Sequence, residues 1–154
     1  MISDINKGRW FAAVQFFILA FVLVFAYSWH DRSSGILWLR YSGAVITIIG
    51  IVIGLIAVFA YGQRVTPNPF PLKEAKLKTT GIYSKVRHPM YLAAIIVITG
   101  WSLMFFSVIS LFFPLIALSF LIIKINFEEK QLIKKFPDYL QYKEKSYHLF
   151  PYIY

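Results

Sequence analysis

Two short segments of this chain carry the residue types that could do chemistry. The first places Arg87 and His88 directly before Pro89, and Gly81, a few residues upstream, predicts a turn. Because proline suits the first turn of a helix, we expect a helix to begin here with both basic side chains at its N-terminus. The unpaired N–H groups of such a turn favour an anion, for example a carboxylate. The simpler interpretation is that an Arg-His pair anchors a membrane helix at the lipid interface.

The second segment contains Lys124, Glu128 and Glu129. Lys124 and Glu128 are one helical turn apart, so they share a face of a helix. A carboxylate at the edge of a membrane is costly unless it meets a cation. That cation could be Lys124, Arg87 or the ammonium group of a ligand. The alternative is a snorkelling lysine beside a solvated acidic pair.

The elements that must position these residues are apolar helices. Of the 154 residues, 58% are hydrophobic and 15% charged, which excludes a disordered chain and argues against an ordinary soluble domain. Apolar stretches cover residues 11–29, about 41–62, and 90–123. The first is longer than the apolar core of a signal peptide and lacks an A-x-A cleavage site, so we interpret it as a permanent helix. The last is too long for one membrane span and short for two, which predicts a tight hairpin turning near residues 107–110.

This pattern predicts an all-α membrane bundle of about four transmembrane helices, the third and fourth forming the hairpin, with Pro114 beginning or kinking the second arm. We expect one integral membrane domain over residues 1–154, with two N-terminal helices in 1–62 and a catalytic core in 63–154. After Pro137, a short cytoplasmic helix should carry Tyr139 and Tyr142 on one side, and either lie on the membrane or close over the preceding loop.

The basic residues predict the orientation of the chain. Six lysines and arginines fall within residues 64–87 and six more from residue 124 onwards, so the positive-inside rule places both segments in the cytoplasm. An even number of spans then places both termini there. The formal net charge of +9 is explained without nucleic acid, and anionic lipid headgroups become expected partners. The absence of cysteine excludes disulfides and a thiol nucleophile.

Both segments resemble a known superfamily. The runs T-P-N-P-F-P…L-K-T-T-G-I-Y-S-K-V-R-H-P-M-Y-L and E-E-K-Q-L-I-K-K-F-P-D-Y-L-Q-Y-K are similar to the core of the isoprenylcysteine carboxyl methyltransferases and their phospholipid N-methyltransferase relatives. The resemblance covers roughly residues 64–151. It implies an integral membrane enzyme that takes S-adenosyl-L-methionine from the cytosol and a lipophilic small-molecule or lipid acceptor from the bilayer.

The resemblance also implies which residues form the site. The cofactor-binding positions are Asn68, Ala75, Lys76, Leu77, Lys78, Tyr83, His88, Pro89, Met90, Tyr91 and Glu128. The catalytic positions are Arg87, Lys124 and Glu128, with Lys124 meeting the acceptor. Glu128 suits the ammonium group of the cofactor, and tyrosine rings suit its adenine or sulfonium. Because a sulfonium is an activated leaving group, we expect direct in-line methyl transfer, with no metal site.

Some residues depart from the family's pattern. Lys124 stands where the prenylcysteine enzymes have arginine, and Pro137 stands where glycine is usual. The terminal arginine motif is replaced by Tyr147-His148-Leu149-Phe150-Pro151. Because lysine cannot bind a carboxylate in a bidentate way, the acceptor need not be an isoprenylcysteine-like carboxylate, and a lipid amine is the other candidate.

Two other functions stay open from the sequence. One is an NADPH-dependent reductase like the sterol reductases, and the other is a non-catalytic membrane scaffold. The expected location is the inner or plasma membrane in a prokaryote, or the endoplasmic reticulum in a eukaryote, with the active site facing the cytoplasm. The sequence leaves the oligomeric state open.

Overall fold

The computed structural model describes residues 2–30, 37–62 and 77–151. Within these ranges the regular structure is helical, as the sequence predicts. The helices are α1 (Ile2–Ser28), α2 (Leu37–Tyr61), α3 (Pro89–Met104), α4 (Phe113–Lys135) and the short α5 (Tyr139–Glu144). Two single turns of 3₁₀-helix, η2 (Gly81–Ser84) and η3 (Ile109–Phe112), precede α3 and α4.

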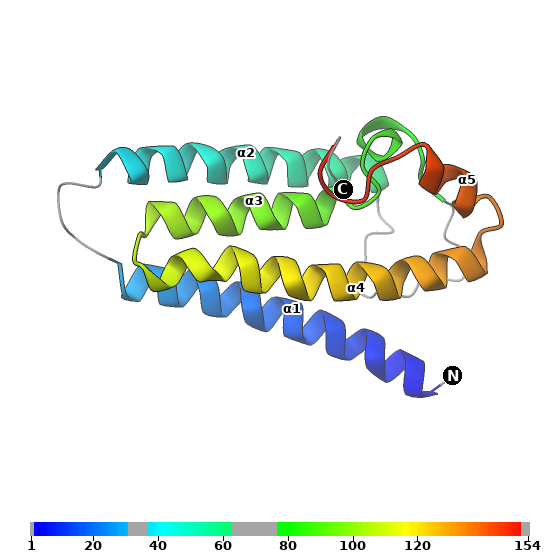
Figure 1. Cartoon of the computed structure of the whole chain (residues 1–154), viewed down its shortest axis with the longest axis horizontal. Helices are drawn as coiled ribbons and strands as arrows, with labels where there is room; N and C mark the ends of the chain where they lie inside the picture. The colour runs from blue at the N-terminus through cyan, green and yellow to red at the C-terminus, as the bar shows by residue number, and fades with distance from the viewer. Residues whose placement is uncertain (1, 31–36, 63–76, 152–154) are drawn as a thin grey trace.

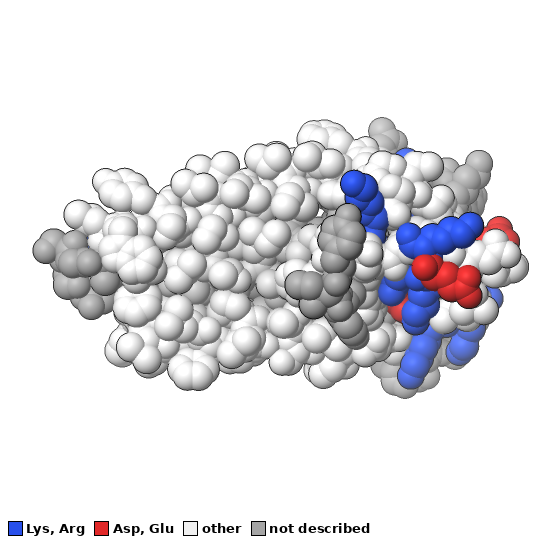
Figure 2. Space-filling model, turned by 45° about the horizontal axis from the view of Figure 1, so that its top comes forward, with Lys and Arg blue, Asp and Glu red and all other residues white. Residues whose placement is uncertain are grey.

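The four long helices run up and down along one axis (Figure 1). α2 lies along α3, and α4 lies beside α3 and α1. One end of the bundle therefore holds the start of α1, the end of α2, the start of α3, the end of α4 and α5 (Figure 1). We call this the polar end, because most of the lysine, arginine and acidic side chains visible in Figure 2 gather there.

The body of the molecule is apolar on its outside, as a membrane-embedded bundle requires. Phe17, Trp38 and Phe59 expose 70%, 67% and 79% of their surface. Within the described residues, three helical stretches are long and apolar enough to cross a membrane: Gly8–Ser28, Leu37–Tyr61 and Ile109–Lys135. The sequence predicts about four spans, of which the two hairpin arms are short. The first of these arms is α3, whose 16 residues reach only about 24 Å, less than the ~30 Å hydrocarbon core.

The hairpin turn between α3 and α4 lies where the sequence predicts it. Ser110 Oγ donates to the carbonyl of Ser102 at 3.0 Å and accepts from the N–H of Ser107 at 3.0 Å. Ser102 and Ser110 are fully buried. These bonds satisfy backbone groups of the turn, which lipid could not do. Pro114 lies in the first turn of α4 and therefore begins the second arm.

Glycines allow α2 and α3 to pack backbone against backbone. A β-carbon on Gly100 would lie 2.5 Å from the backbone nitrogen of Thr47 and 2.7 Å from the carbonyl oxygen of Gly43. Small residues at such crossings let membrane helices approach closely. The seam holds α3, and with it the polar residues at its start, in a defined place along α2.

We expect Gly100→Ala to lower the stability of the bundle by about 1–3 kcal/mol, because the added methyl group forces the two backbones apart. Thermal unfolding of the detergent-solubilised protein measures the effect. Gly54→Ala is the matched control, since a β-carbon there meets only the β-carbon of Ala93 at 3.4 Å. Equal melting temperatures for the two variants would contradict the role of the seam.

Candidate functional site

The two polar segments of the sequence meet at the polar end of the bundle. Arg87 and His88 immediately precede α3, and Glu128 and Glu129 lie near the end of α4. Pro89 is buried at the first position of α3, as predicted. The loop that leads into α3, residues 77–88, is called the entry loop below.

The entry loop folds back against the end of α2. Gly81 has φ +67°, a left-handed conformation that favours glycine and that makes the predicted turn. Tyr83 is buried, donates its hydroxyl to the carbonyl of Ala57 at 3.4 Å, and has its ring centroid 5.6 Å from that of Tyr61. Burial raises the pKa of the Tyr83 phenol above its ordinary value, so the side chain stays a neutral donor.

One cluster of predicted residues forms around Tyr91. Its hydroxyl donates to Glu128 Oε2 at 2.8 Å, and its ring stacks on the ring of His88 with centroids 5.6 Å apart. The ammonium group of Lys124 lies 5.0 Å from the centroid of the same ring. Lys124 is fully buried and also donates to the side-chain oxygen of Gln15 on α1. Lys124 and Glu128 thus share one face of α4, as their spacing predicts.

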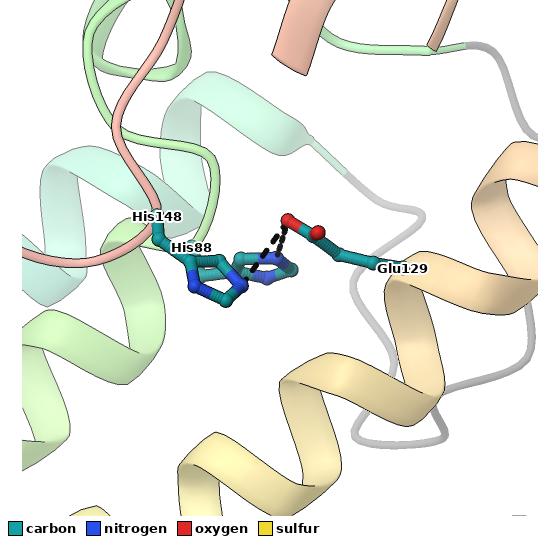
Figure 3. Close-up of side chains that lie close together, drawn as sticks. All are labelled: His88, Glu129 and His148. Carbon is teal, nitrogen blue, oxygen red and sulfur yellow. Dashed lines mark hydrogen bonds and ion pairs between the residues drawn. The ribbon is translucent and has the colours of Figure 1, made fainter. Parts of the chain in front are cut away.

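A second cluster surrounds Glu129, which is only 4% exposed. Arg87 Nε donates to its Oε1 at 2.8 Å, and Lys143 Nζ lies 3.0 Å from its Oε2. The Nε2 atoms of His88 and His148 lie 3.4 and 3.2 Å from Oε1 (Figure 3). Sequence reasoning missed this cluster. It treated Glu129 only as half of an acidic pair, and His148 only as part of a departure from a motif.

Glu128 and Glu129 have different partners because they are neighbours on one helix. Neighbouring residues project about 100° apart around the axis. Glu128 therefore faces Tyr91, whereas Glu129 faces the end of the entry loop and the residues after α4. The sequence offered Arg87 as one possible partner of Glu128; in the structure it pairs with Glu129.

Arg87 ties the entry loop to the residues after α4. Besides Glu129, its guanidinium donates to the carbonyl of Lys143 at 3.0 Å and to the carbonyl of Ser146. Its backbone N–H donates to the carbonyl of Tyr147 at 2.8 Å. The backbone N–H of Tyr147 in turn donates to the carbonyl of Lys85, also at 2.8 Å. This is an anchoring position. The expectation that Arg87 acts on a reacting ligand stays a prediction.

The Glu129 cluster could be taken for a metal centre, because ligand atoms of His88, Glu129 and His148 all lie within 4.8 Å of one another. However, Arg87 and Lys143 already occupy both oxygens of the carboxylate. Their two positive charges would repel a divalent cation at this distance. We therefore interpret the cluster as an ion-pair network.

The short helix α5 packs over the entry loop. This is one of the two positions that the sequence predicts for it. Tyr139 is 1% exposed, and the hydroxyl of Tyr142 donates to the carbonyl of Tyr83 at 2.6 Å. Burial raises the pKa of Tyr142 to about 12, so this donor keeps its proton at neutral pH.

The remaining predicted positions are only partly described. Asn68, Ala75 and Lys76 lie outside the described residues. Leu77 and Lys78 are half-buried at the start of the entry loop, in backbone without regular secondary structure, and Met90 is half-buried in the first turn of α3.

Comparison with known proteins adds the family. A family model described as phospholipid methyltransferase matches residues 38–138, from the start of α2 to the residue before α5. The matched part contains Tyr83, His88, Tyr91, Lys124 and Glu128, and it excludes α1 and α5. A comparison with curated proteins finds no match. Because the match covers well over half of the chain, and because the apolar helices suit an integral membrane protein, the chain belongs to the phospholipid methyltransferase family of membrane methyltransferases.

Proposed function

We propose that this protein transfers a methyl group from S-adenosyl-L-methionine to a lipophilic acceptor at the membrane surface. The observation that carries the proposal is the cluster of Tyr91, Glu128 and Lys124, which lies where α3 begins and α4 reaches the polar end. All three residues fall within the family match.

The chemistry of this cluster fits the amino-acid part of the cofactor. Glu128 is half-buried, and its carboxylate has acceptor capacity beyond the bond from Tyr91, which suits an ammonium group. The N-terminus of α3, with His88 beside it, suits a carboxylate. The ring of Tyr83 suits the adenine or the positive sulfonium, whereas the ring of Tyr91 already contacts His88 and Lys124. When bound, the cofactor supplies a methyl group on that sulfonium, already activated for transfer.

The protein's own contribution is then to align and to desolvate. Glu128 and the start of α3 hold the two ends of the amino-acid group, and Tyr91 fixes the direction of the Glu128 carboxylate. Lys124 presents a buried positive charge on the face of α4 that α1 covers. We propose that it faces the acceptor, either an isoprenylcysteine-like carboxylate or a lipid amine. Holding the reacting atoms in line is the main source of rate in such a displacement.

We further propose that the polar end faces the cytoplasm. The lysines and arginines concentrated there follow the positive-inside rule. The same charges suit contact with anionic headgroups of the surrounding lipid.

Methyl transfer in reconstituted membranes tests the proposal. The protein is placed in vesicles that contain either phosphatidylethanolamine or an S-farnesylated cysteine derivative, and S-adenosylmethionine labelled in its methyl group is added. We expect label in one of the two acceptors. Folded protein that transfers no label and binds no S-adenosylhomocysteine would contradict the proposal, and thermal stabilisation by NADPH alone would favour the reductase alternative.

A further inference from the structure

The residues that follow the family match bind the entry loop closely. The C-terminal segment (residues 139–150) begins directly after the matched residues. Tyr147 exchanges backbone hydrogen bonds with Lys85 and Arg87, both at 2.8 Å, and Tyr142 donates to the carbonyl of Tyr83 at 2.6 Å. The segment is therefore attached along much of the loop that leads into α3.

The same segment also enters the apolar core. Leu149 is 0% exposed and packs in one cluster with Val86 of the entry loop, Leu92 of α3 and Ile125 of α4. Burying such an apolar side chain stabilises the folded chain. The segment is thus held in place by packing as well as by hydrogen bonds.

Through Glu129, the C-terminal segment reaches the predicted cofactor residues. His148 and His88 approach the same oxygen of Glu129, at 3.2 and 3.4 Å, and their rings meet edge to face with centroids 5.6 Å apart (Figure 3). On its other side, the ring of His88 stacks on Tyr91, which donates to Glu128. A continuous series of contacts therefore joins His148 to the carboxylate of Glu128.

We propose that His148 is a positioning residue of the cofactor site, which acts through Glu129 to hold the ring of His88 against Tyr91. The inference rests on the proposed function, since it assumes that His88, Tyr91 and Glu128 bind the cofactor. His148 suits this role better than Lys143, because the side chain of Lys143 is 46% exposed whereas that of His148 is 9% exposed. Exposed ion pairs hold their partners weakly.

A matched pair of amide substitutions tests the proposal. The side-chain N–H of glutamine lies near the position of a histidine Nε2, whereas that of asparagine lies near Nδ1 and falls short of Glu129. We expect His148→Asn to weaken the binding of S-adenosylhomocysteine by about tenfold, the loss of one hydrogen bond to a charged group. His148→Gln should bind nearly as well as the unchanged protein. Lys145→Ala, an exposed site on the same segment, is the control.

A second readout does not depend on the ligand. The chain has three histidines, so the ring signals of the protein labelled in histidine can be followed by NMR. His30 is the internal reference, because it follows the end of α1, which lies at the opposite end of the bundle (Figure 1). We expect the His88 signal to shift or broaden in His148→Asn and to return in His148→Gln.

These two readouts separate the outcomes. If the unchanged protein binds no S-adenosylhomocysteine but the His88 signal responds as expected, the proposed function fails and the positioning role stands. Equal affinities and unchanged His88 signals in both variants would overturn the positioning role. A zinc-dependent change of the His88 and His148 signals, reversed by a chelator, would also overturn it in favour of a metal site.

Discussion

Glu128→Gln is expected to lower the affinity for S-adenosylhomocysteine by about 10- to 100-fold while leaving the melting temperature nearly unchanged. Glutamine keeps an oxygen that can accept the hydrogen bond from Tyr91, but it loses the negative charge that suits the ammonium group of the ligand. A hydrogen bond to a charged group contributes about 1.5–3 kcal/mol, which sets the size of the effect. Titration calorimetry of the detergent-solubilised protein measures it.

The control for this prediction is Glu144→Gln, the same substitution at an exposed position of α5. It removes one negative charge from the polar end without touching the Tyr91 cluster, so it should leave the affinity unchanged. Unaltered affinity in Glu128→Gln, or an equal loss in both variants, would show that the charge at position 128 does not meet the ligand.

Glu129→Gln, unlike Glu128→Gln, is expected to cause a large loss of stability. The side chains of Arg87 and Glu129 are only 6% and 5% exposed, and both histidines and Lys143 depend on the same carboxylate. Removing one partner of a buried ion pair leaves the other charge uncompensated, which costs about 3–5 kcal/mol. For a chain of this size, such a loss lowers Tm by roughly 6 °C or more.

Thermal unfolding of Glu128→Gln and Glu129→Gln, measured side by side, is the sharpest comparison that the chain offers. The two substitutions are chemically identical and one residue apart. We expect only Glu129→Gln to shift Tm and to loosen the C-terminal segment, which limited proteolysis after Lys143 or Lys145 would detect. If the two variants melt together, Glu129 is not the hub of the polar end.

Local signals in the sequence predicted the apolar helices and the residues at which α3 and α4 begin, but not the start of α1, which lies at Ile2 and not at the first residue of the apolar stretch, Phe11. Pro89 predicts where α3 begins, Gly81 predicts the turn before it, and Pro114 predicts the start of α4. The structure confirms all three. Such signals work because proline and glycine act on the backbone of their own residue, whatever the rest of the chain does. Runs of apolar residues likewise report membrane helices without reference to their neighbours in space.

Helical spacing also predicted part of the site. Lys124 and Glu128 share a face because they lie four residues apart, and the structure places both beside Tyr91. Their ligand-binding roles stay predictions that the binding experiments above address.

No local signal in the sequence predicts which residues these side chains contact. Whether Arg87 meets Glu128 or Glu129 depends on how α4 is rotated against the entry loop, a choice between two directions about 100° apart. Gln15 contacts Lys124 across 109 positions of sequence. His148 contacts Glu129 from a segment whose Leu149 packs against Leu92 of α3 and Ile125 of α4. Contacts of this kind follow from the packing of the whole chain, because the energy that selects them is shared among residues that are distant in sequence. The apolar helices and the starts of α3 and α4 can therefore be predicted along the chain, whereas the ion-pair network that holds the polar end together exists only in the folded protein.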